Sequence, residues 1–153
     1  MDNLTEIIKI SARDHANKIA FRQANHEISY QQLATISNKL AYALVDNGLK
    51  KGDRVGIYMT RSIESVYAVY GILLAGGVFV PIDPQSPLAR VEYILKDCQI
   101  AHLISIPSMV VNVRQVKTLE TQVHCIYGVK LEDSSITCIG WDKLYKYQEK
   151  EPV

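Results

Sequence analysis

The fold class of this chain is decided by the stretch Ile72-Leu-Leu-Ala-Gly-Gly-Val-Phe-Val-Pro-Ile-Asp-Pro-Gln-Ser-Pro-Leu-Ala-Arg-Val-Glu-Tyr-Ile-Leu-Lys-Asp-Cys98. Its paired glycines, 76 and 77, predict the end of a helix, because glycine adopts the left-handed conformation that closes helices. The apolar run 78–82 predicts a strand covered on both faces, as in parallel sheets. After a proline-stiffened loop, Ser86 is expected to cap another helix, with Pro87 in its first turn.

The flanking sequence continues this alternation of strands and helices, which predicts a parallel sheet with right-handed crossovers. Ser62 is expected to cap the next helix, which is apolar around most of its circumference, so we expect this helix to be well buried. We expect residues 1–153 to form a single α/β domain, with a mainly parallel sheet, flanking helices and an N-terminal β-hairpin. The expected helices are 4–14, a long one running from a Ser29/Gln32 capping box to Gly48, then 63–74, one that starts at Pro87, and then 108–119 and 141–147. The expected strands are 19–22, 27–30, 53–59, 78–82, 102–106, 123–129 and 136–139.

Composition is that of an ordinary globular protein, with 48% hydrophobic and 22% charged residues and a net charge of +1. Such a balance gives no broad attraction to nucleic acid or to a membrane surface. The near-apolar stretch 66–82 is shorter than the ~18–20 apolar residues of a membrane span, and the N-terminus does not resemble a signal peptide. We expect a cytoplasmic protein with no nucleic-acid partner and no membrane span.

Several motifs with catalytic or binding potential have a simpler structural interpretation. The glycines of Gly71-x4-Gly76-Gly77 precede a strand and lack the Lys-Ser/Thr of a phosphate loop. No Gly-x-Ser-x-Gly elbow is present. His102 and His124 fall on neighbouring predicted strands and could meet, but they have no third metal ligand nearby. The three cysteines, at positions 98, 125 and 138, match no zinc spacing and are expected to be small buried hydrophobes.

The loop Asp83-Pro84-Gln85-Ser86-Pro87 follows the carboxyl end of a predicted parallel strand, which is a usual place for binding loops in α/β proteins. Its two prolines make it rigid. We expect Asp83 and Arg90 to pair across it and fix the loop to the following helix, a structural role that we favour over direct ligand contact.

Three boxes occur in order over residues 4–106. They are Ile28-Ser29-Tyr30-Gln31-Gln32-Leu33, then residues 41–49 with Lys51-Gly52-Asp53-Arg54-Val55-Gly56-Ile57, and then Ala75-Gly76-Gly77-Val78-Phe79-Val80-Pro81-Ile82-Asp83-Pro84 with Pro87 and Arg90. Together they resemble the N-terminal portion of the AMP-forming acyl-activating enzymes. That family includes acyl-CoA ligases (acyl-CoA synthetases), acyl-AMP ligases and the adenylation domains of nonribosomal peptide synthetases. All of these share the boxes, so the boxes do not select a substrate.

This resemblance implies a larger fold with a mobile C-terminal domain and two half-reactions. A fatty, aryl or amino acid carboxylate attacks the α-phosphate of Mg-ATP, and the acyl-adenylate then passes to the thiol of coenzyme A or of a carrier protein. ATP and magnesium are implied for a full-length family member, and none is expected for this chain alone. The family's phosphate-binding loop, its ribose- and metal-binding acids and its catalytic lysine have no matching positions here. We therefore assign no catalytic, cofactor-binding or metal-binding residue.

Two classes of function remain open. The first is an N-terminal fragment of an AMP-forming ligase, inactive alone, whose partner is the remainder of the enzyme or a complementary subunit. The alternative is a non-enzymatic binding or assembly module on the same scaffold. A flavodoxin-like nucleotide binder is disfavoured, because the loops after the strands lack glycine-rich anion cradles. The fragment hypothesis also predicts poor packing and an apolar patch around residues 136–147.

Overall fold

The computed structural model describes residues 3–132 and 135–147. The helices are α1 (Asn3–Asp14), α2 (Tyr30–Asp46), α3 (Ile63–Leu74), α4 (Leu88–Asp97), the 3-10 turn η1 (Pro107–Met109), α5 (Val110–Lys117) and α6 (Trp141–Leu144). The strands are β1 (Ile19–Gln23), β2 (His26–Ser29), β3 (Arg54–Tyr58), β4 (Val78–Ile82), β5 (His102–Ile104), β6 (Cys125–Tyr127) and β7 (Thr137–Ile139).

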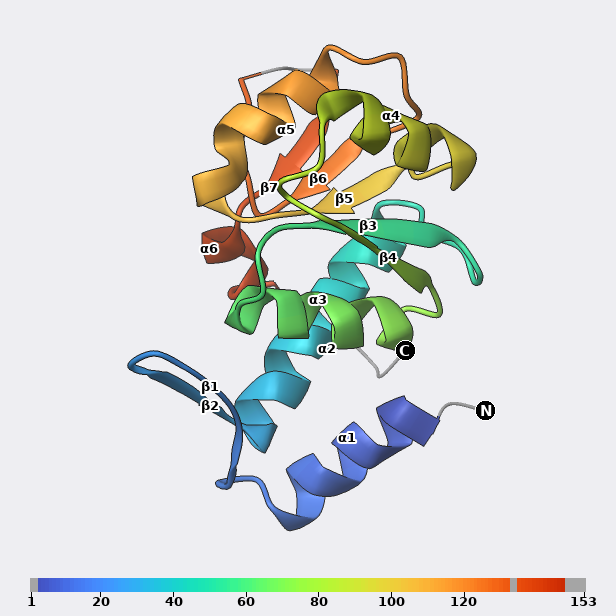
Figure 1. Ribbon diagram of the computed structural model, residues 1–153. Helices are drawn as coiled ribbons and strands as arrows, with labels where there is room; N and C mark the ends of the chain where they lie inside the picture. The colour runs from blue at the N-terminus through green and yellow to red at the C-terminus, as the bar shows by residue number, and fades with distance from the viewer. Residues whose placement is uncertain (1–2, 133–134, 148–153) are drawn as a thin grey trace.

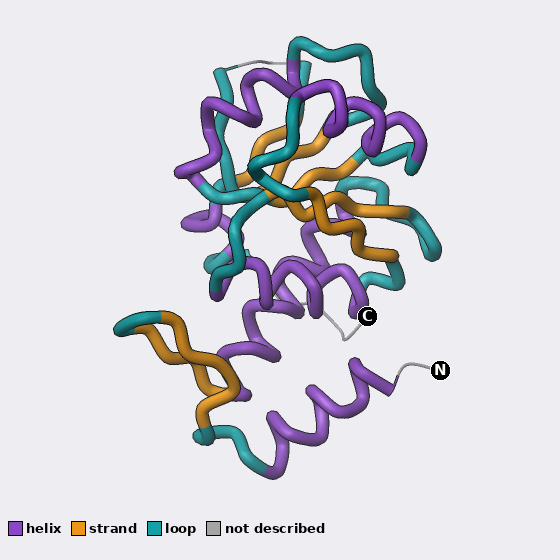
Figure 2. Tube along the Cα trace, viewed as in Figure 1, coloured by secondary structure: helices purple, strands orange, loops and turns teal. Residues whose placement is uncertain are grey.

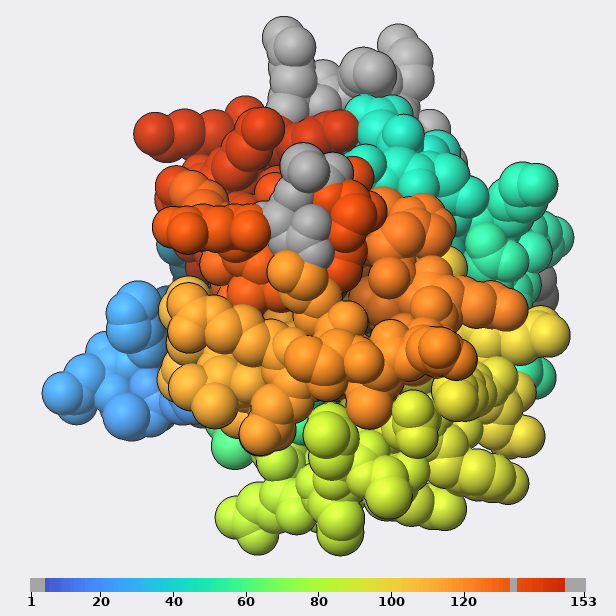
Figure 3. Space-filling view, turned by 90° about the horizontal axis from the view of Figure 1, so that it is seen from above, coloured from blue at the N-terminus to red at the C-terminus, as the bar shows by residue number. Residues whose placement is uncertain are grey.

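Five parallel strands form the central sheet in the order β4-β3-β5-β6-β7. Helices α2 and α3 lie on one side of this sheet, and α4 and α5 lie on the other (Figure 1). Strands β1 and β2 form a separate antiparallel hairpin that projects from the body of the molecule, as the tube in Figure 2 and the space-filling view in Figure 3 both show. The structure confirms the predicted α/β class, the parallel sheet and the N-terminal hairpin.

Local sequence signals set most helix ends. Ser29 and Gln32 form the expected capping box of α2, and Ser62 caps α3 by accepting from the Ser65 amide. Helix α3 ends in a Schellman motif, in which Gly77 N–H donates to the Ile72 carbonyl and Gly76 N–H donates to that of Leu73. These caps satisfy backbone groups that a helix end would otherwise leave unpaired.

The core is centred on the middle strands. Val55 on β3, Leu103 and Ile104 on β5, and Ile126 on β6 have at most 1% of their surface exposed. Leu40 and Leu44 of α2, together with Ile72 of α3, close one side of the sheet and are equally buried. This continuous burial of apolar surface, worth roughly 25 cal/mol per Å2, is the main source of stability.

The prediction that strand 78–82 is covered on both faces was wrong. Strand β4 lies at the edge of the sheet, Val78 is 48% exposed, and Pro81 is also exposed. An edge position tolerates Pro81, because a proline has no N–H to donate to a neighbouring strand. The apolar sequence of β4 therefore predicts more burial than the strand has in this structure.

The prediction of poor packing around residues 136–147 was also wrong. Trp141 and Leu144 are 7% and 1% exposed, and the Trp141 indole N–H donates to the carbonyl oxygen of Ser105 at 2.9 Å. The ring of Tyr67 lies 6.1 Å from that of Trp141 and 6.4 Å from that of Tyr145. Helix α6 is therefore held against the body of the molecule by aromatic contacts and a buried hydrogen bond.

Gly128 shows how closely α6 approaches the sheet. It has a φ of +99°, and a Cβ placed there would collide with the Ser105 carbonyl and with the Trp141 indole. Gly48 has nearly the same φ, +98°, but nothing lies within 4 Å of a Cβ at that position. Both positions disfavour alanine by about 1–2 kcal/mol through the left-handed backbone, whereas only Gly128 adds a steric clash.

We predict that Gly128→Ala lowers the free energy of unfolding by about 2 kcal/mol more than Gly48→Ala, because only Gly128→Ala forces α6 away from β5 and β6. Urea unfolding followed by far-UV circular dichroism measures both losses. Equal losses for the two variants would show that the contact between Gly128, Ser105 and Trp141 is loose.

Candidate functional site

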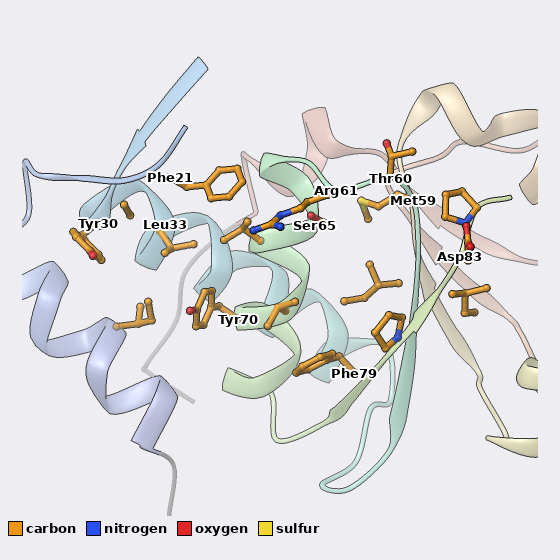
Figure 4. Close-up of a pocket in the computed structure, with 18 residues that line it drawn as sticks. Phe21, Tyr30, Leu33, Met59, Thr60, Arg61, Ser65, Tyr70, Phe79 and Asp83 are labelled. Atoms are coloured by element: carbon orange, nitrogen blue, oxygen red, sulfur yellow. The ribbon is translucent and has the colours of Figure 1, made fainter. Parts of the chain in front are cut away.

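An apolar cleft of about 810 Å3 opens where β3 and β4 end, along the outer side of α3 (Figure 4). Val66, Val69 and Tyr70 of α3 run along it. Loops at the carboxyl ends of parallel strands are where α/β proteins usually bind ligands, so this cleft is the candidate functional site. The other lining residues are Ile8, Ala20, Phe21, Tyr30, Leu33, Ile57, Met59, Thr60, Arg61, Ser65, Phe79, Pro81, Ile82, Asp83 and Pro84.

The charged groups of the cleft come from the two loops that follow β3 and β4. Arg61 lies across the start of α3, beside Phe21 and Ser65, and Asp83 lies farther along the lining (Figure 4). Gln23 of the hairpin holds the Arg61 loop, because its amide donates to the Arg61 carbonyl at 3.4 Å and accepts from Ile63 N–H at 3.0 Å. One guanidinium and one carboxylate in an apolar lining can bind polar groups of a ligand. They do not form the pair of a nucleophile and an activating base that covalent catalysis requires.

The Asp83 loop differs from the prediction. Among the described residues no ion pair joins Asp83 to Arg90. Instead the Asp83 carboxylate accepts from Gln85 N–H at 2.9 Å and its carbonyl accepts from Ser86 N–H at 3.0 Å, which makes a turn. The Arg90 guanidinium lies 5.5 Å from the centre of the Tyr93 ring. Helix α4 has Pro87, not Ser86, as its N-cap, because Pro87 is still extended, with a ψ of 149°.

The crevice between β3 and β5 is the topological switch point of the sheet, since β3 leads to β4 on one side and the chain returns to β5 on the other. Nucleotides bind at such points in flavodoxin-like sheets of this strand order. Here the buried Ser105 hydroxyl donates to the Tyr58 carbonyl across the crevice. At the start of α3, Ile63 N–H donates to Gln23 and Ser65 N–H donates to Ser62. These three donors are occupied, so among the described residues they form no phosphate cradle.

His102 and His124 meet at the amino ends of β5 and β6, with ring centres 5.3 Å apart. His102 is 2% exposed, and its Nδ1 lies 2.9 Å from the Tyr127 hydroxyl. The pKa of His102 is lowered from 6.5 to about 4, chiefly by burial and secondarily by His124, while Asp53 acts in the opposite direction. His102 is therefore a neutral core side chain at physiological pH.

The cysteines are less buried than expected, because Cys98 and Cys138 are only partly buried. Cys125 is buried, with its Sγ 3.1 Å from Nδ1 of His124, and burial raises the pKa of its thiol. A raised pKa disfavours the reactive thiolate. Within residues 3–132 and 135–147, no group of three or more histidine, cysteine or acidic side chains is arranged to hold a metal ion. Among the same residues no helix is long and apolar enough to cross a membrane.

Reasoning from the sequence missed the cleft as a site, because its lining comes from segments far apart in the chain. Residues from α1, β1, α2, α3, β3 and β4 converge there, and no spacing rule connects them. One local signal did exist. Helix α3 is apolar around most of its surface, yet Val66, Val69 and Tyr70 are only partly buried.

The structure thus defines a parallel α/β scaffold with a closed switch point and an open apolar cleft. The sequence model of the AMP-binding enzyme family matches residues 8–152. The chain belongs to this family, as the sequence boxes indicated.

Relatives and solved structures agree with this assignment. Syringomycin synthase SyrB1 from Pseudomonas syringae pv. syringae is 44% identical over 101 residues, which cover 66% of this chain and 16% of that protein. Coronafacic acid ligase from Pectobacterium brasiliense matches 100% of this chain and 31% of its own, with a TM-score of 0.85 and 22% identity. The nonribosomal peptide synthetase FmoA3, solved bound to α-methyl-L-serine-AMP, matches 98% of this chain and 15% of its own, with a TM-score of 0.76 and 25% identity. This chain therefore spans less than a third of each of these proteins.

The pKa of His102 predicts how stability depends on pH. The unfolded chain takes up the proton first, because the folded pKa of about 4 lies below the unfolded value of 6.5. The contribution of His102 is therefore complete above pH 6.5 and is lost as the pH falls toward 4. At about 1.4 kcal/mol per pKa unit the loss is about 3 kcal/mol.

We predict that His102→Gln removes this part of the acid destabilisation, although the variant is less stable than the parent at pH 7. Urea unfolding at pH 7, 6, 5 and 4 measures the free energy of unfolding of the parent and the variant. His26→Gln, at an exposed position on β2, is the matched control substitution. A His102→Gln curve parallel to that of the parent over this range would show that His102 does not control it.

Proposed function

We propose that this chain provides the N-terminal scaffold of the large domain of an AMP-forming ligase. In this proposal the complete enzyme activates a fatty, aryl or amino acid carboxylate with ATP and passes the acyl group to the thiol of coenzyme A or of a carrier protein. Residues 1–153 act as one α/β domain in the cytoplasm, and they do not catalyse either half-reaction alone.

The observation that carries this proposal is the combination of family membership over residues 8–152 with the closed switch point. The relatives that share the fold are several times longer than this chain. Within the described residues, the crevice where such a sheet would hold a nucleotide is occupied by the bond from Ser105 to Tyr58 and by capped donors. Scaffolding therefore accounts for what these residues do better than catalysis does.

The residues described here do not fit ATP or magnesium. The Ser105 hydroxyl and the Ile63 and Ser65 amides already have partners, and among the described residues no acidic cluster could hold a metal. A magnesium site is built from carboxylates and phosphate oxygens held together. We therefore derive no step through either group, and we assign no catalytic, cofactor-binding or metal-binding residue of this chain.

One observation favours the second candidate, a non-enzymatic binding or assembly module. Helix α6 is well packed, with Trp141 and Leu144 buried, which gives the described residues a closed core on that side. The two candidates differ in whether this fold supports adenylation when it is joined to the rest of a family member.

We predict that the purified 153-residue chain does not catalyse carboxylate-dependent exchange of pyrophosphate into ATP with a panel of amino, fatty and aryl acids. A chimera of SyrB1, in which this chain replaces the matching segment, should retain exchange with an amino acid of that panel. Exchange by the isolated chain above a heat-killed control would overturn the scaffold role. A soluble chimera without exchange would favour the assembly module.

A further inference from the structure

The cleft carries two charged side chains without an ionic partner. Among the described residues no ion pair joins Arg61 or Asp83 to a group of opposite charge. Figure 4 places the two apart, with Arg61 near Phe21 and Asp83 farther along the lining. A charge that is taken out of water needs an opposite charge beside it. A surface that covers this cleft must therefore present an acid to Arg61 and a base to Asp83.

A second copy of the chain presents both groups. In a two-fold interface the same patch is used by both copies, so that residue i meets residue j and residue j meets residue i. An axis in the plane of the cleft, between Arg61 and Asp83, brings Asp83 of each copy opposite Arg61 of the other. The rotation pairs all four charges without any further group.

The two walls of the cleft are complementary under the same rotation. On the Arg61 side, the β1–β2 hairpin projects from the body and brings Phe21 to the lining (Figures 1 and 2). On the Asp83 side, β4 is the edge of the sheet, with Val78 48% exposed. The rotation therefore places the projecting hairpin of one copy against the open edge of the other. Pro81 has no N–H to donate, which disfavours a sheet continued across the contact.

The extent of the cleft is suited to reversible association. Eighteen residues line it (Figure 4), whereas stable interfaces use about 20–30 residues on each side. Its centre is the outer side of α3, where Val66 and Val69 are only partly buried. These side chains supply the apolar middle of an interface, and the charged groups lie toward its two ends.

We propose that two copies of this chain associate through their clefts, with Arg61 of each copy paired to Asp83 of the other and the two α3 helices packed between these pairs. This inference concerns the 153-residue chain by itself. It goes beyond the proposed function and does not depend on it, because neither adenylation nor any other part of an enzyme enters the argument.

Sedimentation equilibrium of the parent chain tests the association. We expect the weight-average mass to rise from 17.2 kDa toward twice that value between about 1 μM and about 300 μM, as for a weak interface. A mass of 17.2 kDa at every concentration would overturn the proposal and leave the cleft to a different protein. Growth beyond two copies would overturn the closed two-fold arrangement.

Charge reversal tests the pairing. Arg61→Asp and Asp83→Arg each place like charges opposite one another in a homodimer, so we expect each to weaken self-association at least about tenfold. An equimolar mixture of the two variants should associate again, because every acid then faces a base. Arg114→Asp, at an exposed position on α5 across the sheet, is the matched control and should associate as the parent does. Single variants that associate like the parent, or a mixture that stays monomeric, would contradict the pairing.

The Asp83 carboxylate also accepts a hydrogen bond from Gln85 N–H, so circular dichroism and thermal melting check that Asp83→Arg is folded. If it is not, Arg61→Asp is compared with Arg61→Lys, which keeps the positive charge. Association that is lost in Arg61→Asp and kept in Arg61→Lys supports the proposal. Equal association of these two variants overturns it.

Discussion

Ser105 is the residue on which the closed side of this molecule depends. Its hydroxyl donates to Tyr58 on β3, its amide donates to Tyr127 on β6, and its carbonyl accepts from the Trp141 indole. These three bonds are fully buried, so loss of any one leaves a polar group unsatisfied at a cost of about 1–3 kcal/mol. They join two neighbouring strands and α6 to the end of β5. The bond to Tyr58 also spans the crevice between β3 and β5, where sheets of this order usually hold a nucleotide.

The carboxyl ends of the strands therefore form two different regions. Around the end of β5 the polar groups bond to one another, and α6 packs there. Beyond β3, toward β4, the chain leaves an apolar cleft bordered by α3 and the hairpin, with Arg61 and Asp83 as its charged groups. A domain that is well packed on one side and open on the other suits a piece of a larger enzyme, and it fits the AMP-binding family to which the chain belongs.

Local chemistry made much of this fold predictable from the sequence. The Ser29–Gln32 capping box, the cap at Ser62 and the glycines after α3 depend on residues a few positions apart, and all were predicted correctly. The edge position of β4 was not predicted, because strand order is set by long-range pairing that an apolar run does not encode. The packing of Trp141 depends on Ser105, 36 residues earlier. The Asp83–Arg90 pair failed because Asp83 bonds to its own turn instead. The cleft required six elements to converge, and only the all-round apolar character of α3 hinted at it.

Amide hydrogen–deuterium exchange of the isolated chain is the most direct measurement of this division between a closed and an open side. We expect the slowest exchange in β3, β5 and β6 around Ser105, with α6 also protected, and much faster exchange in the β1–β2 hairpin and along β4. Exchange in the hairpin and β4 as slow as in β3 and β5 would show that the cleft side is as closed as the side around Ser105, contrary to this expectation.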